Sequence, residues 1–532
     1  MFASELILVL GLCVLACYML TGPLRTPAPI LLLAAGILLG FAPPLRKAGL
    51  PPEAVLFVFL PALIYWESLT VSLQDIRRYQ VGILLMSTAL VVLTAAAVAV
   101  TMHLLGLPWG PAWVLGAAIA PTDATAVGAL ARVLPHRNIT LLRAESLIND
   151  GTALVVYGVA VSITTGSESL GPLDISGLFL LAYAGGIAAG LVTIRLSMLA
   201  QRHLADPVLG SVASVLTPFT AFVLADLVNA SGVLAVVVTG LGISQYGPRL
   251  VTAPTRWQIE SFWSLSTFML NGALFVLMGL ELQRTVRGLH GTSQLLHGLL
   301  AVGVVALVLV AVRLGFLFLM TSMMRLRNRV PLELRPELGR RASMVSGLAG
   351  FRGAVSLAAV LATPTVVASG AAFPDRGVIV FVASGVIVLT LVVQGPLLPA
   401  VVRWASLPGD AHVYRSERRL AETVAFSEAL RALPPTAERL GTSPDVTAVL
   451  QHEYARHLHV LRARSAGSSA PPDPTVQSHE QYRQLSLALL ASKRATVVRL
   501  RDEHRINDTV LRELQFQLDL EEIRLAPPEA PG

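Results

Sequence analysis

The sequence predicts an all-α polytopic membrane protein with a helical cytoplasmic tail. More than half of the 532 residues are apolar and only 14% are charged, and the mean hydropathy is +0.67. A soluble core does not need this much apolar surface, whereas a bilayer does. Apolar runs recur along residues 1–404, and charges become dense from about residue 405. We therefore expect a transmembrane domain over 1–404 and a tail of cytoplasmic helices over 405–532.

Apolar runs of membrane-spanning length define about thirteen predicted helices, since one crossing takes about 20 residues. The expected spans are 4–20, 28–42, 52–71, 80–105, 111–134, 141–165, 173–199, 208–228, 231–246, 258–281, 294–324, 342–363 and 376–404. The first run lacks a basic leading region and an Ala-x-Ala site, so it reads as a retained helix rather than a signal peptide. Cys13 and Cys17 lie in this run and indicate neither a disulfide framework nor a zinc site.

The arginines between the spans predict an orientation. If the C-terminus is cytoplasmic, the cytoplasmic loops hold Arg25, Arg77, Arg78, Arg132, Arg137, Arg143, Arg195, Arg202, Arg249, Arg256 and the run from Arg325 to Arg341. The outer loops then hold only Arg46, Lys47, Arg284, Arg287 and Arg376. This asymmetry is the positive-inside pattern. It favours an odd number of spans in the cell (plasma) membrane with the N-terminus outside, and it explains the net charge of +7 without a nucleic-acid partner.

The fifth predicted span contains an unexpected polar site, "APTDATAVGAL". Pro121 has no amide hydrogen and disfavours helix at Ala120, so we expect the helix to break here. A broken helix exposes carbonyls that can bind a cation and amides that attract an anion. Asp123 can cap such amides. Both Thr122 and Asp123 join the predicted cation- and proton-binding set, and the Thr122 carbonyl is the stronger candidate for direct cation contact.

The sixth predicted span contains the main candidate site, "ESLINDGTALVVYG". Ser146 and Asp150 are four residues apart and share one helix face, with Glu145 and Asn149 on the adjacent row. Hard cations prefer oxygen ligands. Burial disfavours a charged carboxylate and a bound cation favours it, so Asp150 can hold a proton or a cation but rarely both. That competition is the chemical basis of an exchanger, and it makes Asp150 the expected exchange group, with Ser146 and Glu145 beside it. The alternative is a polar cluster that only ties helices together.

The twelfth predicted span places Arg352 between two glycines in "GLAGFRGAVSLAAV". The glycines weaken the helix. Because an arginine does not lose its proton, Arg352 cannot carry the exchanged proton. We expect it to pair with a carboxylate and to fix the charge of the site. Glu67 in the third span is the predicted partner, with Asn149 supporting the pair.

Other polar residues within the spans receive simpler interpretations. Arg313 lies well inside the eleventh span and is assigned to packing or snorkelling. Glu281 lies near the end of the tenth span and is assigned to the membrane interface. Asn271 fits a helix–helix hydrogen bond as well as a place on the ion pathway.

The two interrupted spans occupy corresponding positions in spans 1–6 and 8–13. Broken spans at corresponding positions indicate inverted repeats, with a binding site where the two broken helices cross. The sequence shows no residue-level repeat, so this argument rests on position alone.

These segments closely resemble the bacterial members of the monovalent cation:proton antiporter family (family 1) that includes the animal sodium/proton exchangers. The matching strings are "APTDATAV", "ESLINDGTALV", "SGVLAVVVTGLGIS", "FMLNGALFVLMGLEL" and "GLAGFRGAVSLA". They run in the family's order and cover about residues 5–405. The tail string "RLRDEHRINDTVLRELQFQLDLEEIRL" is similar to tails of the bacterial branch. The resemblance implies a homodimer of thirteen-helix protomers, each with a dimerisation domain and a six-helix core that moves in an elevator-like manner.

The resemblance also implies roles for individual residues. It implies that Asp150 carries the cation or the proton, and that Glu145, Ser146 and the Thr122 carbonyl help to bind the ion. It also implies an ion pair between Glu67 and Arg352. The family often has Asp-Pro at the broken helix, whereas Asp123 precedes Ala124 here and Pro121 lies ahead of it. Members with Asn-Asp are typically electroneutral, which implies one cation exchanged for one proton.

The predicted function is exchange of sodium for a proton across the membrane at Asp150. Potassium/proton exchange by the same residues is the close alternative, since selectivity depends on cavity dimensions. A passive cation channel would favour symmetric rings or repeated filter loops, and a sensor without transport does not need both Asp150 and Arg352. The sequence contains no catalytic triad, metal motif or phosphate loop of an enzyme. No cofactor is expected beyond the transported ions, and the expected partners are membrane lipids and a second copy of the chain.

Overall fold

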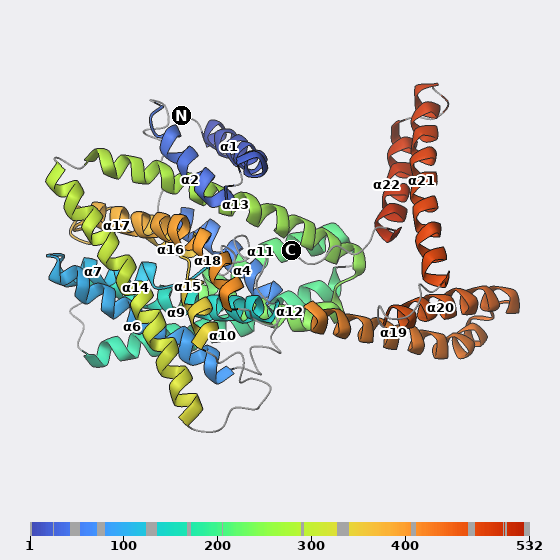
Figure 1. Cartoon of the computed structure of the whole chain (residues 1–532), viewed down its shortest axis with the longest axis horizontal. Helices are drawn as coiled ribbons and strands as arrows, with labels where there is room; N and C mark the ends of the chain where they lie inside the picture. The colour runs from blue at the N-terminus through green and yellow to red at the C-terminus, as the bar shows by residue number, and fades with distance from the viewer. Residues whose placement is uncertain are drawn as a thin grey trace. The chain divides into compact units, whose positions relative to one another are not determined.

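The computed structural model describes residues 3–24, 26–42, 54–71, 80–123, 136–166, 172–204, 206–288, 292–326, 340–405, 411–465, 474–503, 505 and 508–525. These residues form helices, joined by turns and one isolated bridge between Val366 and Ala372 (Figure 1). The chain divides into two compact units, Met1–Gly409 and Asp410–Gly532. The all-helical fold class predicted from the sequence is confirmed.

The described helices of the first unit overlap the predicted spans, apart from 124–134 of the fifth span, which lies outside the described residues. In chain order they are α1 (Ala3–Leu24), α2 (Ala28–Leu39), η2 (Val55–Phe59), α4 (Leu60–Thr70), α6 (Gln80–Leu104), α7 (Trp109–Ile119), α9 (His136–Thr164), α10 (Pro172–His203), α11 (Pro207–Asp226), α12 (Gly232–Leu250), α13 (Ala253–Gly288), α14 (Thr292–Leu326), α15 (Arg340–Leu348), α16 (Ala354–Leu361), α17 (Arg376–Leu389), η4 (Thr390–Gln394) and α18 (Gly395–Ala405). Within the described residues, 8 helical stretches are long and apolar enough to cross a membrane, and shorter apolar helices accompany them.

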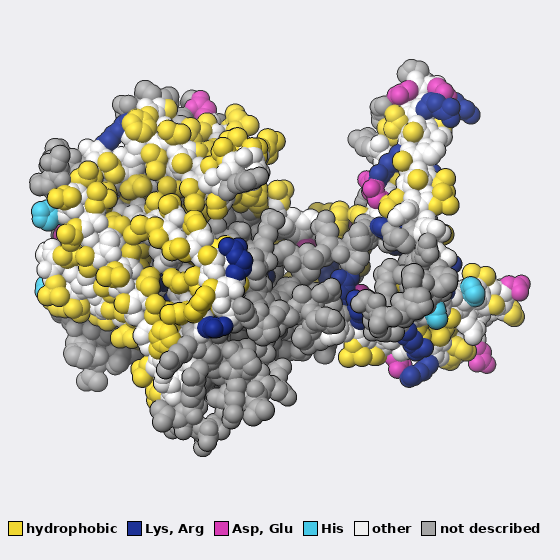
Figure 2. All heavy atoms as spheres, viewed as in Figure 1, with side chains coloured by type: hydrophobic (Ala, Val, Ile, Leu, Met, Phe, Trp, Pro, Cys, Tyr) yellow, Lys and Arg dark blue, Asp and Glu magenta, His cyan; other side chains and the backbone are white. Residues whose placement is uncertain are grey.

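The surface of the first unit suits lipid rather than water. Figure 2 shows apolar side chains over much of its visible face, with few charges among them. Leu8, Leu180, Leu296 and Leu307 are 61–69% exposed. Soluble proteins rarely expose contiguous apolar patches of this kind, whereas a bilayer requires them. The chain is therefore a multi-pass membrane protein.

The helices of the first unit pack in two groups. The scaffold group comprises α1, α2, α4, α10, α11, α12 and α13, where α12 packs on α4 and α10, and α13 packs on α1, α2 and α11. The site group comprises α6, α7, α9 and α14 to α18, where α6, α7 and α9 pack together and α14 joins α6 to α15 and α17. The groups meet where α13 contacts α16 and α17, and where α9 contacts α4, α10 and α12.

Two glycines allow α2 and α13 to pack backbone against backbone. A Cβ atom at Gly36 would collide with the carbonyl oxygen of Val276, and one at Gly279 would collide with that of Leu33. In a bilayer, helix association depends on close van der Waals packing, and small residues permit it. The pair of helices forms a firm part of the scaffold group.

The second unit contains α19 (Ala411–Leu440), α20 (Pro444–Ser465), α21 (Pro474–Asp502) and α22 (Asp508–Leu525). Helix α19 packs on α20, and α21 packs on α22. Lys493 on α21 lies 3.0 Å from the carboxylate of Glu521 on α22. Arg494 pairs with Glu522 and Asp519, and the hydrogen bond with Glu522 raises the pKa of its guanidinium above the ordinary value. The mixture of charges on this unit is visible in Figure 2.

Candidate ion-binding site

The first helix break lies at Pro121, as the sequence predicted. Helix α7 ends at Ile119, and residues 120–123 continue without helical structure. The break frees the carbonyls of Ala120 and Pro121, and both accept hydrogen bonds from Nη1 of Arg352, the second at 2.8 Å. Residues 124–134, the rest of the predicted fifth span, lie outside the described residues.

The second break lies between α15 and α16, and the two breaks cross each other. The amide of Asp123 donates to the carbonyl of Phe351 at 2.8 Å. In return, the amide of Ala354 donates to Oδ2 of Asp123 at 3.2 Å. A Cβ atom at Gly353 would collide with the Asp123 carboxylate, so this approach requires glycine. Asp123 therefore caps the first turn of α16, and the crossed broken helices expected from the sequence are present.

Helix α9 attaches to the first break through two hydrogen bonds. The hydroxyl of Ser146 donates to the Thr122 carbonyl at 2.7 Å. The side-chain amide of Asn149 donates to Oγ1 of Thr122 at 2.8 Å. All three residues are buried. The Thr122 carbonyl has a second lone pair, so the hydrogen bond from Ser146 leaves one acceptor position without a donor among the described residues.

Asp150 is buried in the same cluster, with 2% of its surface exposed. The carboxylates of Glu67 and Asp123 are close enough to repel its negative charge. Glu67 reaches the cluster from α4 of the scaffold group and lies near the Ser146 hydroxyl. Buried like charges are unfavourable unless a proton or a cation compensates them. The geometry thus assembles acidic groups that favour a positive occupant.

Two oxygen atoms at this cluster have no hydrogen-bond donor among the described residues. They are Oε1 of Glu67 and Oδ1 of Asn149, and both are buried. Buried acceptors are normally paired, and carboxylate and amide oxygens are ligands that hard cations prefer. The donor set therefore fits a transported alkali cation. In the described part of the chain, no three His, Cys, Asp or Glu side chains gather tightly enough for a resident metal.

Sequence reasoning missed the role of Arg313. Its Nη1 lies 2.9 Å from Oε1 of Glu145, with 4% and 10% of the two side chains exposed. Its Nε also donates to the carbonyl of Ser346 at 3.0 Å. Arg313 is thus held by charge rather than by packing or snorkelling, and Glu145 is occupied by a guanidinium. The available signal was the depth of Arg313 in its span, since an arginine remote from both ends needs a partner.

The predicted ion pair between Glu67 and Arg352 does not form among the described residues. Among the described residues, Arg352 donates to the carbonyls freed by the first break instead. The groups that act on the Glu67 carboxylate are Ser146, Asp123 and Arg143. Opposite charge made Glu67 a plausible partner in the sequence, but two unpaired carbonyls in a broken helix compete for the same guanidinium hydrogens.

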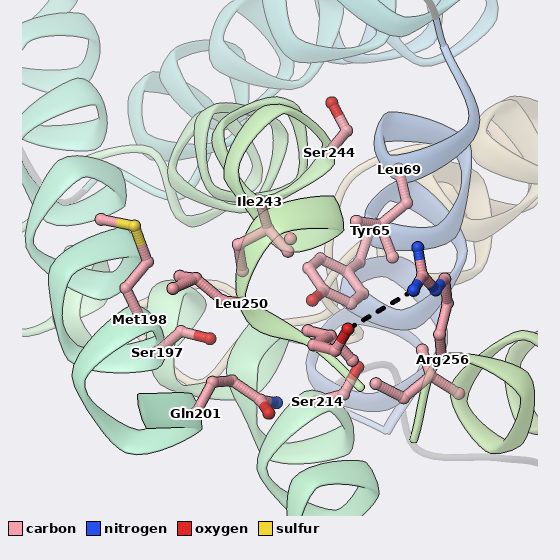
Figure 3. A pocket seen from close by; sticks show the side chains of 13 residues that line it. Tyr65, Leu69, Ser197, Met198, Gln201, Ser214, Ile243, Ser244, Leu250 and Arg256 are labelled. Carbon is pink, nitrogen blue, oxygen red and sulfur yellow. Dashed lines mark hydrogen bonds between the residues drawn. The ribbon is translucent and has the colours of Figure 1, made fainter. Parts of the chain in front are cut away.

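A separate cavity of about 200 Å³ lies within the scaffold group (Figure 3). Tyr65 and Leu69 of α4 line it, together with Ile243 of α12 and Arg256 of α13. Tyr65 and Leu69 are one turn apart on α4, whereas Glu67 lies between them in sequence and so points to a different face. The cavity is therefore distinct from the carboxylate cluster.

Comparisons with known proteins agree with this arrangement. Residues 9–404 match the family described as "Sodium/hydrogen exchanger, transmembrane". An uncharacterized Na(+)/H(+) exchanger of Mycobacterium tuberculosis (strain ATCC 25618 / H37Rv) is 41% identical over 508 residues, which cover 95% of this chain and 93% of that protein. The sodium, potassium, lithium and rubidium/H(+) antiporter of Bacillus subtilis (strain 168) is 29% identical over 70% of this chain and 57% of that protein. The sodium proton antiporter MjNhaP1 from Methanocaldococcus jannaschii shares the fold, with a TM-score of 0.57 and 18% identity over 75% of this chain and 98% of that one.

Proposed function

Because the chain belongs to the transmembrane sodium/hydrogen exchanger family, we propose that it exchanges sodium for a proton across the membrane at Asp150. The observation that carries this proposal is the buried Asp150 beside Ser146, in a cluster where one oxygen each of Glu67 and Asn149 has no donor among the described residues. A proton or a sodium ion would relieve the repulsion among the carboxylates. Each occupant displaces the other, so the two ions share one site in turn.

The ligands proposed for sodium are oxygens from three helical segments. Asp150 supplies the charge, and the Ser146 hydroxyl keeps lone pairs after donating to Thr122. The open position on the Thr122 carbonyl and the unpaired oxygen of Glu67 complete the set. Arg352 keeps its charge in every state, so it acts as a fixed counter-charge and not as a proton carrier.

We also propose the setting in which this exchange takes place. The loop arginines favour a cytoplasmic C-terminus and tail and an outer N-terminus. Neutral exchange of one cation for one proton follows if Asp150 alone changes its occupant. We propose that two copies assemble in the membrane through their scaffold groups, which the α2–α13 contact helps to hold firm.

Flux measurements on the full-length protein in lipid vesicles test the site. A sodium gradient should move protons in the wild type, and Asp150→Asn should reduce this flux to the level of empty vesicles. Asp226→Asn is the matched control, because it neutralises an exposed carboxylate at the end of α11. Retained flux in Asp150→Asn would refute the proposed site.

The same vesicles test competition and charge balance. The half-saturating sodium concentration should rise as the pH falls while the maximal rate is preserved, because both ions bind one carboxylate. Potassium and lithium gradients compare the other cations at the same site. A sodium gradient that generates a membrane potential would contradict one-for-one exchange.

A further inference from the structure

One ion pair joins the scaffold group to the site group. Arg376 opens α17 of the site group, and its Nη1 lies 3.3 Å from Oε1 of Glu281 on α13 of the scaffold group. The side chains are 22% and 19% exposed. The other ion pairs recorded among the described residues of this unit, Arg284–Glu281 and Arg313–Glu145, each stay within one group.

Arg376 also connects this pair to the helix that carries Asp150. Its Nε donates to the carbonyl of Thr363, just beyond the end of α16, at 3.0 Å. The Thr363 hydroxyl accepts a hydrogen bond from the hydroxyl of Tyr157 on α9 at 3.2 Å. Tyr157 follows Asp150 by about two helical turns. Arg376 therefore anchors the end of α16 and the start of α17 to α13, and it connects to the helix of the site through two hydrogen bonds at Thr363.

The pair lies at the outer end of the unit in the proposed orientation. Glu281 is in the last third of α13, and Arg376 follows the connection from α16, both on the side with few arginines. A transporter with alternating access moves one bundle against another around a fixed site. Contacts that cross between the moving parts at one end must break when that end opens.

We propose that Glu281 and Arg376 form an outer latch, which holds α16 and α17 against α13 while the outer end is closed. The latch rests on the proposed exchange function, because opening outward is a step of that cycle. Separation of the pair allows the two groups to part at this end. Re-formation of the pair closes the outer end again.

Access of a thiol reagent from outside tests the latch. Cys13 and Cys17 are first replaced by serine, and Val360→Cys is then introduced on α16, where the native side chain is only 3% exposed. Labelling by a membrane-impermeant maleimide should rise about two- to fivefold in Arg376→Gln, the population change expected for loss of a partly exposed ion pair. Glu281→Gln should act in the same way.

Arg284→Gln provides the matched control. Arg284 contacts the same carboxylate, with its Nη1 at 3.1 Å from Oε2 of Glu281, but it lies on the same helix. Its removal should leave labelling at the parent level. Arg376→Lys keeps the positive charge and should keep labelling near the parent level. Equal labelling in Arg376→Gln and Arg284→Gln, or no rise in either Arg376→Gln or Glu281→Gln, would overturn the latch.

Flux separates failure of the latch from failure of the exchange site. Arg376→Gln should keep sodium-driven flux that depends on Asp150, which shows that the protein is folded. Unchanged labelling together with this flux rejects the latch alone. Labelling itself needs no transport, so it reports on the latch alone. Flux that does not depend on Asp150 rejects the exchange site instead.

Discussion

The buried pair of Arg313 and Glu145 predicts a large energetic coupling. Arg313→Met keeps an unbranched side chain but leaves Glu145 charged and unpaired in the site group. Removing one partner of a buried ion pair costs about 3–5 kcal/mol. Loss of the hydrogen bond to the Ser346 carbonyl adds about 1 kcal/mol. We therefore expect Arg313→Met to lower the free energy of unfolding by about 4–6 kcal/mol.

The reverse change, Glu145→Met, should cost about 3–5 kcal/mol, because it strands the guanidinium of Arg313. The double variant should cost only about 1–2 kcal/mol, since two apolar side chains replace the buried pair and only the Ser346 carbonyl stays unpaired. The single losses sum to about 7–11 kcal/mol, so the coupling should exceed about 5 kcal/mol. The assay is unfolding of the purified protein in micelles by a denaturing detergent.

The partly exposed pair of Arg284 and Glu281 is the comparison for this cycle. Its side chains are 29% and 19% exposed, so its coupling should stay within about 1 kcal/mol. If the Arg313 and Glu145 losses add to within about 0.5 kcal/mol, the two residues do not act as a buried ion pair, and the reasoning fails.

Two glycine substitutions give further tests. Gly353→Ala should force the Asp123 carboxylate away from the start of α16. The lost cap should lower the free energy of unfolding by about 1 kcal/mol or more and reduce sodium-driven proton flux. Gly303→Ala, where the added methyl group meets open space on α14, should leave the flux intact. Gly279→Leu should separate α2 from α13 and cost about 1–3 kcal/mol by overpacking, seen as a lower melting temperature in detergent. A matched loss in Gly315→Leu, where a side chain meets open space, would contradict this reading of the contact.

The sequence predicts most of the helices because the bilayer imposes a length and a composition on each span. It predicts the first break because Pro121 removes a donor, and the second because glycines flank Arg352. The π-helical turns at Val55–Phe59 and Thr390–Gln394 had no comparable signal, since ordinary apolar residues form them.

The composition of the site was predictable, but its pairing was not. Ser146 and Asp150 share a helix face by spacing alone. Which carboxylate meets which guanidinium depends on how distant helices pack, and Glu145 and Arg313 are far apart in the chain. The polar residues of the site could therefore be identified from the sequence. Only the three-dimensional arrangement shows that Arg313 pairs with Glu145 and that Arg352 donates to the broken helix.

The crowding of carboxylates around Asp150 bears on the fidelity of the cycle. With Arg313 and Glu145 neutralising each other, the carboxylates of Glu67, Asp123 and Asp150 outnumber the guanidinium groups of Arg143 and Arg352. An unoccupied site would have to reorient with uncompensated negative charge in a medium that strongly disfavours it. Reorientation of the empty carrier is therefore unfavourable. In this way the bilayer itself suppresses uncoupled transport that would dissipate the ion gradients.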